Sequence, residues 1–203
     1  MKTDIILAGV GGQGILSIAT IIGKAALDEN LYIKQAEVHG MSQRGGDVQS
    51  NLRISDKPIA SDLIPYGKAD IVLSMEPMEA LRYINYLDPK GWIVTNSTPF
   101  VNIENYPAEQ DIKEELNKIK NVIYFDMDKV AKEIGSPRSS NMVLLGAASP
   151  FLMMEVNLLE NAIASVFERK GEKIVDQNIA ALKAGRDYVL NYLKDSEYAA
   201  SFK

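Results

Sequence analysis

The residues whose types and spacing could do chemistry lie in two glycine-containing segments near the start of the chain. In the first, the apolar run 4–8 leads into GVGGQG at residues 9–14, and apolar residues follow at helical spacing. This order predicts a strand, a tight turn and a helix, which would aim unpaired N–H groups and the positive end of the helix dipole at a ligand. The expected chemistry is binding of a phosphate or carboxylate. The candidate contacts are Gly11, Gly12, Gln13 and Gly14.

The glycine turn also has an interpretation that needs no ligand, because glycines permit a tight turn and let a helix pack close to a strand. The sequence leaves both interpretations open. The turn is not a Walker A loop, which needs Lys and then Ser or Thr after its last glycine, because Gly14 is followed by Ile15 and Leu16. ATP chemistry of that kind is therefore not expected.

The second segment reads HGMSQRGG and contains the only histidine of the chain. Arg44 and the N–H groups of Gly45 and Gly46 would suit a phosphate or carboxylate, and His39 could donate a proton or a hydrogen bond. The alternative is a tight connection in which Arg44 pairs with a local carboxylate and His39 caps a backbone carbonyl. A hydrolase built on Ser42 and His39 is not expected, because no acidic partner is placed and no nucleophile elbow is present.

The hydropathy pattern predicts the elements that must position these two segments. Apolar runs indicate strands, and 3.6-residue periodicity indicates helices. Strands are expected over 4–10, 31–38, 47–55, 69–76, 91–96 and 121–126, and helices over 12–29, from Pro77 to Leu87, over 113–120 and 128–134, from Ser140, and over 158–169 and 173–193. The strand over 47–55 follows the second segment without a crossover helix. We therefore expect a three-layer, Rossmann-like α/β domain, with a mixed but mostly parallel sheet and C-terminal helices, as one domain over residues 1–203.

Three further features have both a functional and a structural interpretation. Glu37 lies near the end of the second strand, where dinucleotide-binding folds place an acidic residue on the ribose. Glu76 and Asn96 follow strands at the edge where α/β proteins bind ligands, although Glu76 could simply cap the next helix. The uncharged run 142–148 contains small residues and predicts a helix that is buried or packed against a partner subunit.

Composition narrows the class of protein. A formal charge of −5 over 203 residues argues against a general nucleic-acid binder. The absence of cysteine excludes disulfides, a thiolate nucleophile and Cys-ligated zinc or iron–sulfur clusters, and a single histidine excludes a multi-histidine metal site. We also expect no leader, no membrane segment and a cytoplasmic location, because the chain has no signal-like opening and no apolar run of spanning length.

Taken with these motifs, the sequence resembles the gamma subunit or domain of the 2-oxoacid:ferredoxin oxidoreductases. The resemblance rests on residues 9–14, on EVHGMSQRGG at 37–46 and on NMVLLG at 141–146, and Asn178 and Gly185 also fit. Within that family the form of the second segment is most similar to the indolepyruvate type. The likeness covers nearly the whole chain.

The resemblance implies a subunit of an enzyme that oxidatively decarboxylates aryl 2-oxoacids to acyl-CoA and reduces ferredoxin. Thiamine diphosphate, Mg²⁺ and iron–sulfur clusters would lie on a large partner subunit, and CoA would be a co-substrate. No cofactor is then expected to bind tightly to this chain, which would line a shared cleft and be inactive alone. Two other hypotheses stay open: a stand-alone NAD(P)-dependent dehydrogenase that uses Glu37, and a docking scaffold whose glycine turn binds nothing.

Overall fold

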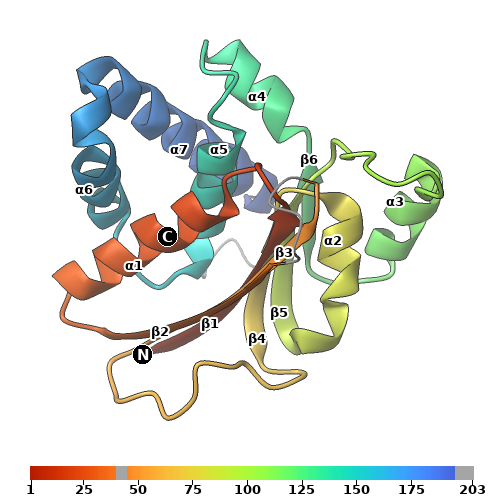
Figure 1. The fold of residues 1–203 in the computed structure, drawn as a ribbon, viewed down its shortest axis with the longest axis horizontal. Coiled ribbons are helices and arrows are strands. Elements are labelled where there is room, and N and C mark those ends of the chain that lie inside the picture. The colour runs from red at the N-terminus through yellow and green to blue at the C-terminus, as the bar shows by residue number, and fades with distance from the viewer. Residues whose placement is uncertain (40–44, 195–203) are drawn as a thin grey trace.

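The computed structural model describes residues 1–39 and 45–194, and its centre is a six-stranded sheet. The strand order is β2-β3-β1-β4-β5-β6 (Figure 1). The strands span Lys2–Val10 (β1), Tyr32–His39 (β2), Asp47–Ser55 (β3), Ala69–Ser74 (β4), Leu87–Asn96 (β5) and Val122–Phe125 (β6). β1, β4, β5 and β6 pair in parallel, whereas β3 is antiparallel to both β1 and β2. The predicted α/β class and mixed, mostly parallel sheet are confirmed.

The position of β3 corrects one detail of the expected topology. The strands expected over 4–10 and 31–38, joined by the helix expected over 12–29, predict a βαβ unit, in which the two strands would commonly be neighbours. In the structure β3 lies between them, with Glu37 opposite Ser50 and Ser50 opposite Leu7. β3 pairs antiparallel with β2 on one side and with β1 on the other, so it occupies the edge of β1 that β2 would otherwise take.

One face of the sheet is covered by a helical layer, which holds the larger core. The layer consists of α1 (Ile15–Asp28), α5 (Ser140–Ala148), α6 (Val156–Phe167) and α7 (Glu172–Leu193), and α4 (Met127–Glu133) extends it at the top of Figure 1. Short 3₁₀ turns follow α5 and α6 at Ser149–Phe151 and Glu168–Lys170. Apolar residues at alternate positions of the strands, such as Ile5 and Leu7, point into this layer and are fully buried. The C-terminal helices are confirmed.

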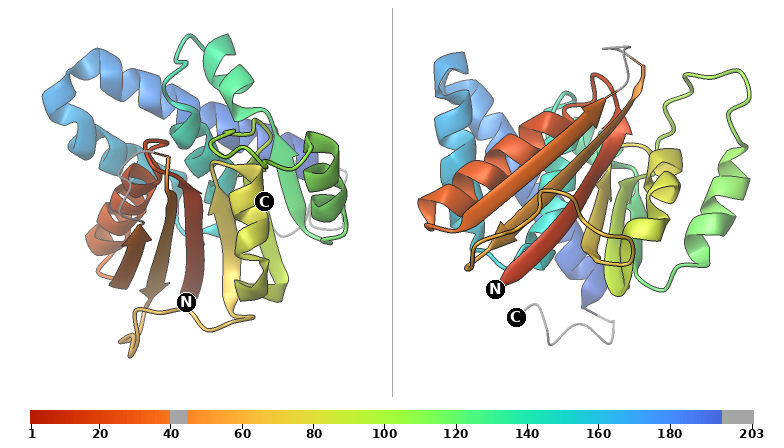
Figure 2. Two further views of the ribbon diagram at one scale, coloured as in Figure 1. Left: turned by 45° about the vertical axis from the view of Figure 1, so that its right-hand side comes forward. Right: turned by 60° about the horizontal axis from the view of Figure 1, so that its bottom comes forward.

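The opposite face is covered only in part, by α2 (Pro77–Arg82) and α3 (Glu109–Asn117). Figure 2 shows α2 in front of β4 and β5, while the same side of β2 and β3 has no helix over it within the described residues. Ile6 and Ala8 form a smaller core here with Ile112 and Leu116 of α3. The molecule therefore has three layers on one half of the sheet.

Two expected helices differ from the structure. The helix predicted from Pro77 to Leu87 ends at Arg82, a 3₁₀ turn occupies Ile84–Tyr86, and Leu87 already begins β5. A longer helix would carry the chain past the position where Leu87 pairs with Ala69. The exposed helix expected over 113–120 is α3, whose buried Ile112 and Leu116 lie one turn apart among charged residues.

The uncharged run is buried inside the chain, which decides between its two interpretations. α5 is enclosed between the sheet and α7, and every residue from Met142 to Ala148 is buried. Gly146 and Gly185 face each other at the crossing of α5 and α7: a Cβ on Gly146 would lie 1.8 Å from the Leu182 carbonyl oxygen, and one on Gly185 would lie 2.0 Å from that of Val143. The two helices therefore approach each other closely at this crossing.

Candidate functional site

A cleft of about 480 Å³ lies at the carboxyl ends of β1, β4 and β5, the edge where open α/β sheets bind ligands. Five parts of the chain meet there: the glycine turn, the end of β4, the end of β5 with the segment after it, the start of α4, and the start of α5 with the loop before it. The lining residues are Gly12, Gln13, Met75, Asn96, Thr98, Pro99, Phe100, Asp128, Pro137, Arg138, Ser140 and Asn141. Polar side chains therefore come together from segments that are far apart in the sequence.

The glycine turn has a backbone that only glycine adopts easily. Gly12 and Gly14 have φ values of 103° and 82°, and Gly14 is the N-cap of α1 without any side-chain cap. Asn141 Nδ2 donates to the Gly14 carbonyl at 3.2 Å, and a Cβ on Gly14 would lie 2.6 Å from that same nitrogen. The turn thus presents the uncapped N-terminus of a 14-residue helix beside the cleft.

Gln13 ties the turn to the neighbouring strand. Its Oε1 accepts a hydrogen bond from the Val10 N–H at 2.7 Å, and its Nε2 donates to the Met75 carbonyl at 3.3 Å. Both ends of the amide are therefore used in holding the backbone of the turn. Its contact with a ligand stays a prediction, and so do the ligand contacts of Gly11, Gly12 and Gly14.

The structure brings the two glycine segments together. The Gly11 N–H donates to the Gly46 carbonyl at 2.8 Å, and the Gly45 N–H donates to the Gly11 carbonyl at 3.4 Å. These bonds hold the two segments side by side, and the ligand contacts of Gly45 and Gly46 stay predictions. Ser42, Arg44 and the side chain of His39 lie outside the described residues, and their ligand contacts stay predictions.

Asp128 is the centre of a polar group that the sequence did not single out. Asn96 Nδ2 donates to its Oδ2 at 2.9 Å and Ser140 Oγ donates to its Oδ1 at 2.5 Å, while Asn96 Oδ1 accepts from the Met127 N–H. Burial alone would raise the pKa of Asp128, but the hydrogen bonds from Ser140 and Asn96 favour the carboxylate and hold its pKa below the usual value. The wall of the cleft therefore carries a fixed negative charge.

Arg138 supplies the opposite charge. It is exposed, it lines both this cleft and a neighbouring cleft of about 500 Å³ over Ser17 and Gln177, and within the described ranges no carboxylate pairs with it. Lys170 lines the neighbouring cleft and lies 5.0 Å from the centre of the Phe167 ring. An unpaired guanidinium close to an uncapped helix N-terminus suits a phosphate or carboxylate.

Sequence reasoning missed Arg138 because the stretch around it was interpreted only as the end of a helix. One signal was available: residues 135–138 follow the strand over 122–125 and a single short helix, so they return to the same edge of the sheet. Asn96 was expected at this edge and does lie there. Glu76 is fully buried and caps α2 through the Glu79 N–H at 2.8 Å, as its structural interpretation predicts.

The geometry argues against a dinucleotide site built on Glu37. In dinucleotide-binding folds the acidic residue lies on the strand next to the glycine turn, whereas β3 here separates β2 from β1. Neighbouring strands are about 4.8 Å apart, so Glu37 lies one strand spacing too far from the turn. Its exposed side chain is on an edge strand.

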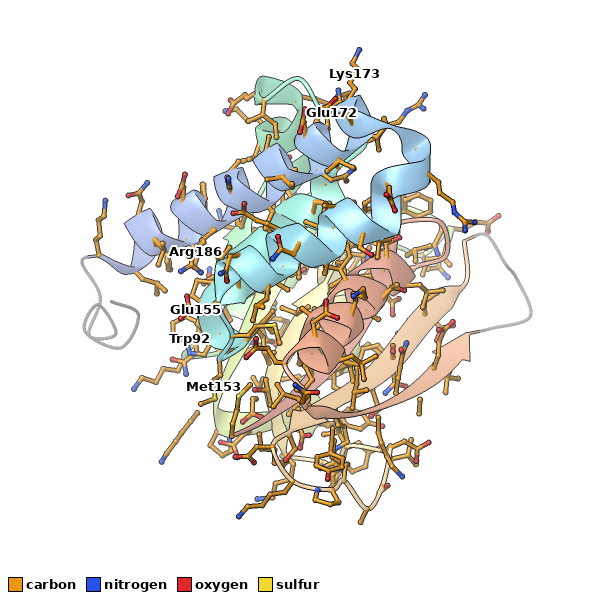
Figure 3. The ribbon with its side chains drawn as sticks, turned by 90° about the vertical axis from the view of Figure 1, so that its left-hand side faces the viewer. Trp92, Met153, Glu155, Glu172, Lys173 and Arg186 are labelled. Carbon is orange, nitrogen blue, oxygen red and sulfur yellow. The ribbon has the colours of Figure 1, made fainter. Side chains whose placement is uncertain are left out.

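A third cleft, of about 350 Å³, lies at the other end of the molecule. It is formed by the start of β1, the loop before β2, the turn after α5, the start of α6, and α7. Figure 3 shows Met153, Glu155 and Arg186 on this side, and Arg186 donates to Ser149 Oγ at 2.9 Å. Because it lies at the amino ends of β1 and β2, this cleft is not at the ligand-binding edge of the sheet.

The part of the chain that the structure describes contains neither a cluster of metal ligands nor a membrane-spanning helix. Over residues 1–39 and 45–194 no three His, Asp or Glu side chains gather as a metal site would require. In the same ranges no helix has both the length and the apolar character needed to cross a bilayer.

Comparison with known proteins decides the family. A sequence profile of the pyruvate ferredoxin/flavodoxin oxidoreductase family matches residues 4–188. The chain belongs to this family. It is 34% identical, over 94% of its length and 97% of the relative's, to the indolepyruvate oxidoreductase subunit IorB of Archaeoglobus fulgidus.

Solved structures show the same fold. The gamma subunit of a keto/oxoacid ferredoxin oxidoreductase from Geobacter sulfurreducens matches with a TM-score of 0.66 and 24% identity, over 93% of this chain and 99% of that subunit. The 2-oxoglutarate:ferredoxin oxidoreductase of Magnetococcus marinus matches with a TM-score of 0.73 and 24% identity, over 93% of this chain but only 31% of the longer one.

These findings confirm the resemblance and the fold class. The family member described here is a subunit of a 2-oxoacid:ferredoxin oxidoreductase, as the sequence predicts, and so part of an oxidoreductase. They do not favour the stand-alone dehydrogenase. Subunit status also implies larger partner chains.

Proposed function

We propose that this chain is the small subunit of an indolepyruvate-type 2-oxoacid:ferredoxin oxidoreductase and forms one wall of an active site shared with a larger subunit. The 2-oxoacid loses CO₂ and two electrons, the electrons pass to ferredoxin, and the acyl group forms a thioester with CoA. Thiamine diphosphate, Mg²⁺ and the iron–sulfur clusters belong to the larger subunit. The chain acts as one unit over residues 1–203, in the cytoplasm.

The observation that carries this proposal is the guanidinium of Arg138, which pairs with no carboxylate of residues 1–39 and 45–194. It lines a cleft whose other wall is the uncapped N-terminus of α1, and both features favour an anion. The CoA phosphates and the carboxylate of a 2-oxoacid are anions of this kind. We also propose that the predicted ligand contacts belong to this site: Gly11, Gly12, Gln13, Gly14, His39, Ser42, Arg44, Gly45 and Gly46.

The fixed carboxylate of Asp128 adds orientation. Held by Asn96 and Ser140, it lines the cleft and repels one side of an anionic ligand. An anion in the cleft therefore lies toward Arg138 and the glycine turn. In this arrangement the chain binds and orients a substrate, while the reacting groups come from the partner.

The experiment is a comparison of Arg138 variants in the reconstituted complex. Arg138→Ala should raise the KM for CoA or for the 2-oxoacid about tenfold, with a smaller change in kcat, because it removes a contact made equally in ground and transition states. Arg138→Lys should recover part of the loss. Arg169→Ala, another exposed cation outside both clefts, is the matched control and should change nothing. Unchanged KM values for both substrates in Arg138→Ala would refute the anion role.

A further inference from the structure

The side chain of Glu76 is fully buried, and its carboxylate accepts more hydrogen bonds than the cap of α2 requires. Oε2 accepts the Glu79 N–H, which is the cap of α2. Oε1 accepts the Phe100 N–H at 3.3 Å and the hydroxyl of Tyr106. The cap therefore uses one oxygen, and the other oxygen holds two points of a different part of the chain.

That part is the cleft-wall segment, residues 97–108, which joins β5 to α3. Most of its side chains are exposed, and Thr98, Pro99 and Phe100 line the cleft. Beyond the two bonds to Glu76, Asn102 Nδ2 donates to the Gly45 carbonyl at 2.6 Å. The segment thus links Glu76 to the second glycine segment, which in turn is bonded to Gly11.

A buried carboxylate is costly to ionise, so it needs donors that compensate for lost hydration. Glu79, its buried neighbour, pairs with Arg82. No salt bridge reaches Glu76 in the described chain, and its donors are the N–H groups of Glu79 and Phe100 with the Tyr106 hydroxyl. Burial, and then the bond to Glu76, raise the pKa of Tyr106, which therefore stays a donor at any working pH.

We propose that Glu76 is a positioning residue: its buried carboxylate fastens the cleft-wall segment and, through Asn102 and Gly45, sets the position of the glycine loops that receive the anionic substrate. The role in catalysis rests on the proposed function. The mechanical role does not, because hydrogen bonds of this chain alone define it.

The test uses Glu76→Gln with Glu79→Gln as its control. The two carboxylates are both buried and lie three residues apart, but only Glu76 bonds the cleft-wall segment. In Glu76→Gln, hydrogen exchange measured by mass spectrometry should become at least severalfold faster in peptides covering 97–106 and 9–14. In the assembled complex the KM for CoA should rise about tenfold with kcat within about twofold. Glu79→Gln should leave the exchange of these peptides and the KM unchanged.

Two further variants keep the test decisive if Glu76→Gln fails to fold. Tyr106→Phe removes one donor to Glu76, and Asn102→Ala cuts the link at the exposed end of the segment. Both should speed exchange in peptide 9–14 and raise the KM in the same direction. Slow exchange and an unchanged KM in these variants, in a complex whose wild type turns over, would overturn the positioning role and leave the proposed function standing. An inactive wild-type complex, together with fast exchange in the variants, would refute the proposed function and leave the positioning role of Glu76 standing.

Discussion

Replacing Gly146 by alanine should destabilise the protein, although the same change in an ordinary helix is stabilising. Gly146 lies in the middle of α5, where alanine is favoured by about 1 kcal/mol on helix propensity. The Cβ would lie 1.8 Å from the Leu182 carbonyl oxygen and 2.7 Å from its carbon. Both atoms are backbone, so no side-chain rotation can relieve the overlap.

The magnitude follows from how far α5 and α7 must separate. An ordinary contact is about 3.4 Å or more, so the helices must move apart by roughly 1.5 Å at a crossing that packs Gly146 against Leu182 and Gly185 against Val143. Overpacking of this kind costs about 1–3 kcal/mol and sometimes more, which exceeds the propensity gain. We expect a net loss of about 2 kcal/mol and a Tm lower by about 4–8 °C in a chain of this length.

The assay is urea and thermal unfolding of the full chain, with Gly135→Ala as the matched control. Gly135 has a φ of 73°, but a Cβ added there would have no atom within 4 Å, so its substitution costs only the conformational term, about 1 kcal/mol. Gly185→Ala strains the same crossing, and the double variant should lose less than the sum. A Gly146→Ala protein as stable as the wild type would refute the steric account.

Three other predictions concern the site and the sheet. Asp128→Asn should lower the unfolding free energy by about 1 kcal/mol or less at pH 7. The difference should start to shrink when pH falls below about 4, the unfolded-state pKa, and be lost below the lower folded-state pKa, because the carboxylate stabilises the fold only while it is ionised; urea unfolding at several pH values measures this. Gly14→Ala should lower the unfolding free energy by about 1–2 kcal/mol, because the φ of 82° is unfavourable for alanine and the added Cβ displaces Asn141; thermal unfolding should show a lower Tm. Gly12→Ala should lower the unfolding free energy by less, because no atom lies within 4 Å of its added Cβ. Arg53→Met should lower the unfolding free energy by about 3 kcal/mol, because it leaves the fully buried Asp4 with Lys2 as its remaining salt-bridge partner among the described residues. Adding Asp4→Asn should recover part of that loss, and equal stability of the single and double variants in urea would contradict this reasoning.

The sheet and its helices could be predicted because their signals are local. Residues 5–8 are all apolar since β1 is buried on both faces, and the glycines that follow permit a φ that other residues avoid. The position of β3 between β1 and β2 could not be predicted with the same ease, because pairing depends on which edge is free when the chain returns. The expectation of a mixed sheet came from the missing crossover helix alone.

The site was predictable only where its residues lie in motifs. Gly12 and Gln13 belong to a recognisable turn and do line the cleft. Asp128 and Arg138 lie more than a hundred residues away in sequence and belong to no motif, and Asn141, although it begins the NMVLLG motif, reaches the turn through a long-range contact with Gly14. Their convergence depends on long-range contacts, such as the Asn96–Asp128 and Asn141–Gly14 hydrogen bonds, that no sequence spacing encodes.

The most direct test of the central claim is reconstitution from separately purified subunits. Ferredoxin reduction dependent on an aryl 2-oxoacid and CoA would be measured for this chain alone, for its larger partner alone, and for the two mixed. A subunit that forms one wall of a shared site predicts turnover only in the mixture, with a KM for CoA that rises in Arg138→Ala. Robust turnover by this chain alone, or full activity of the partner without it, would contradict the account.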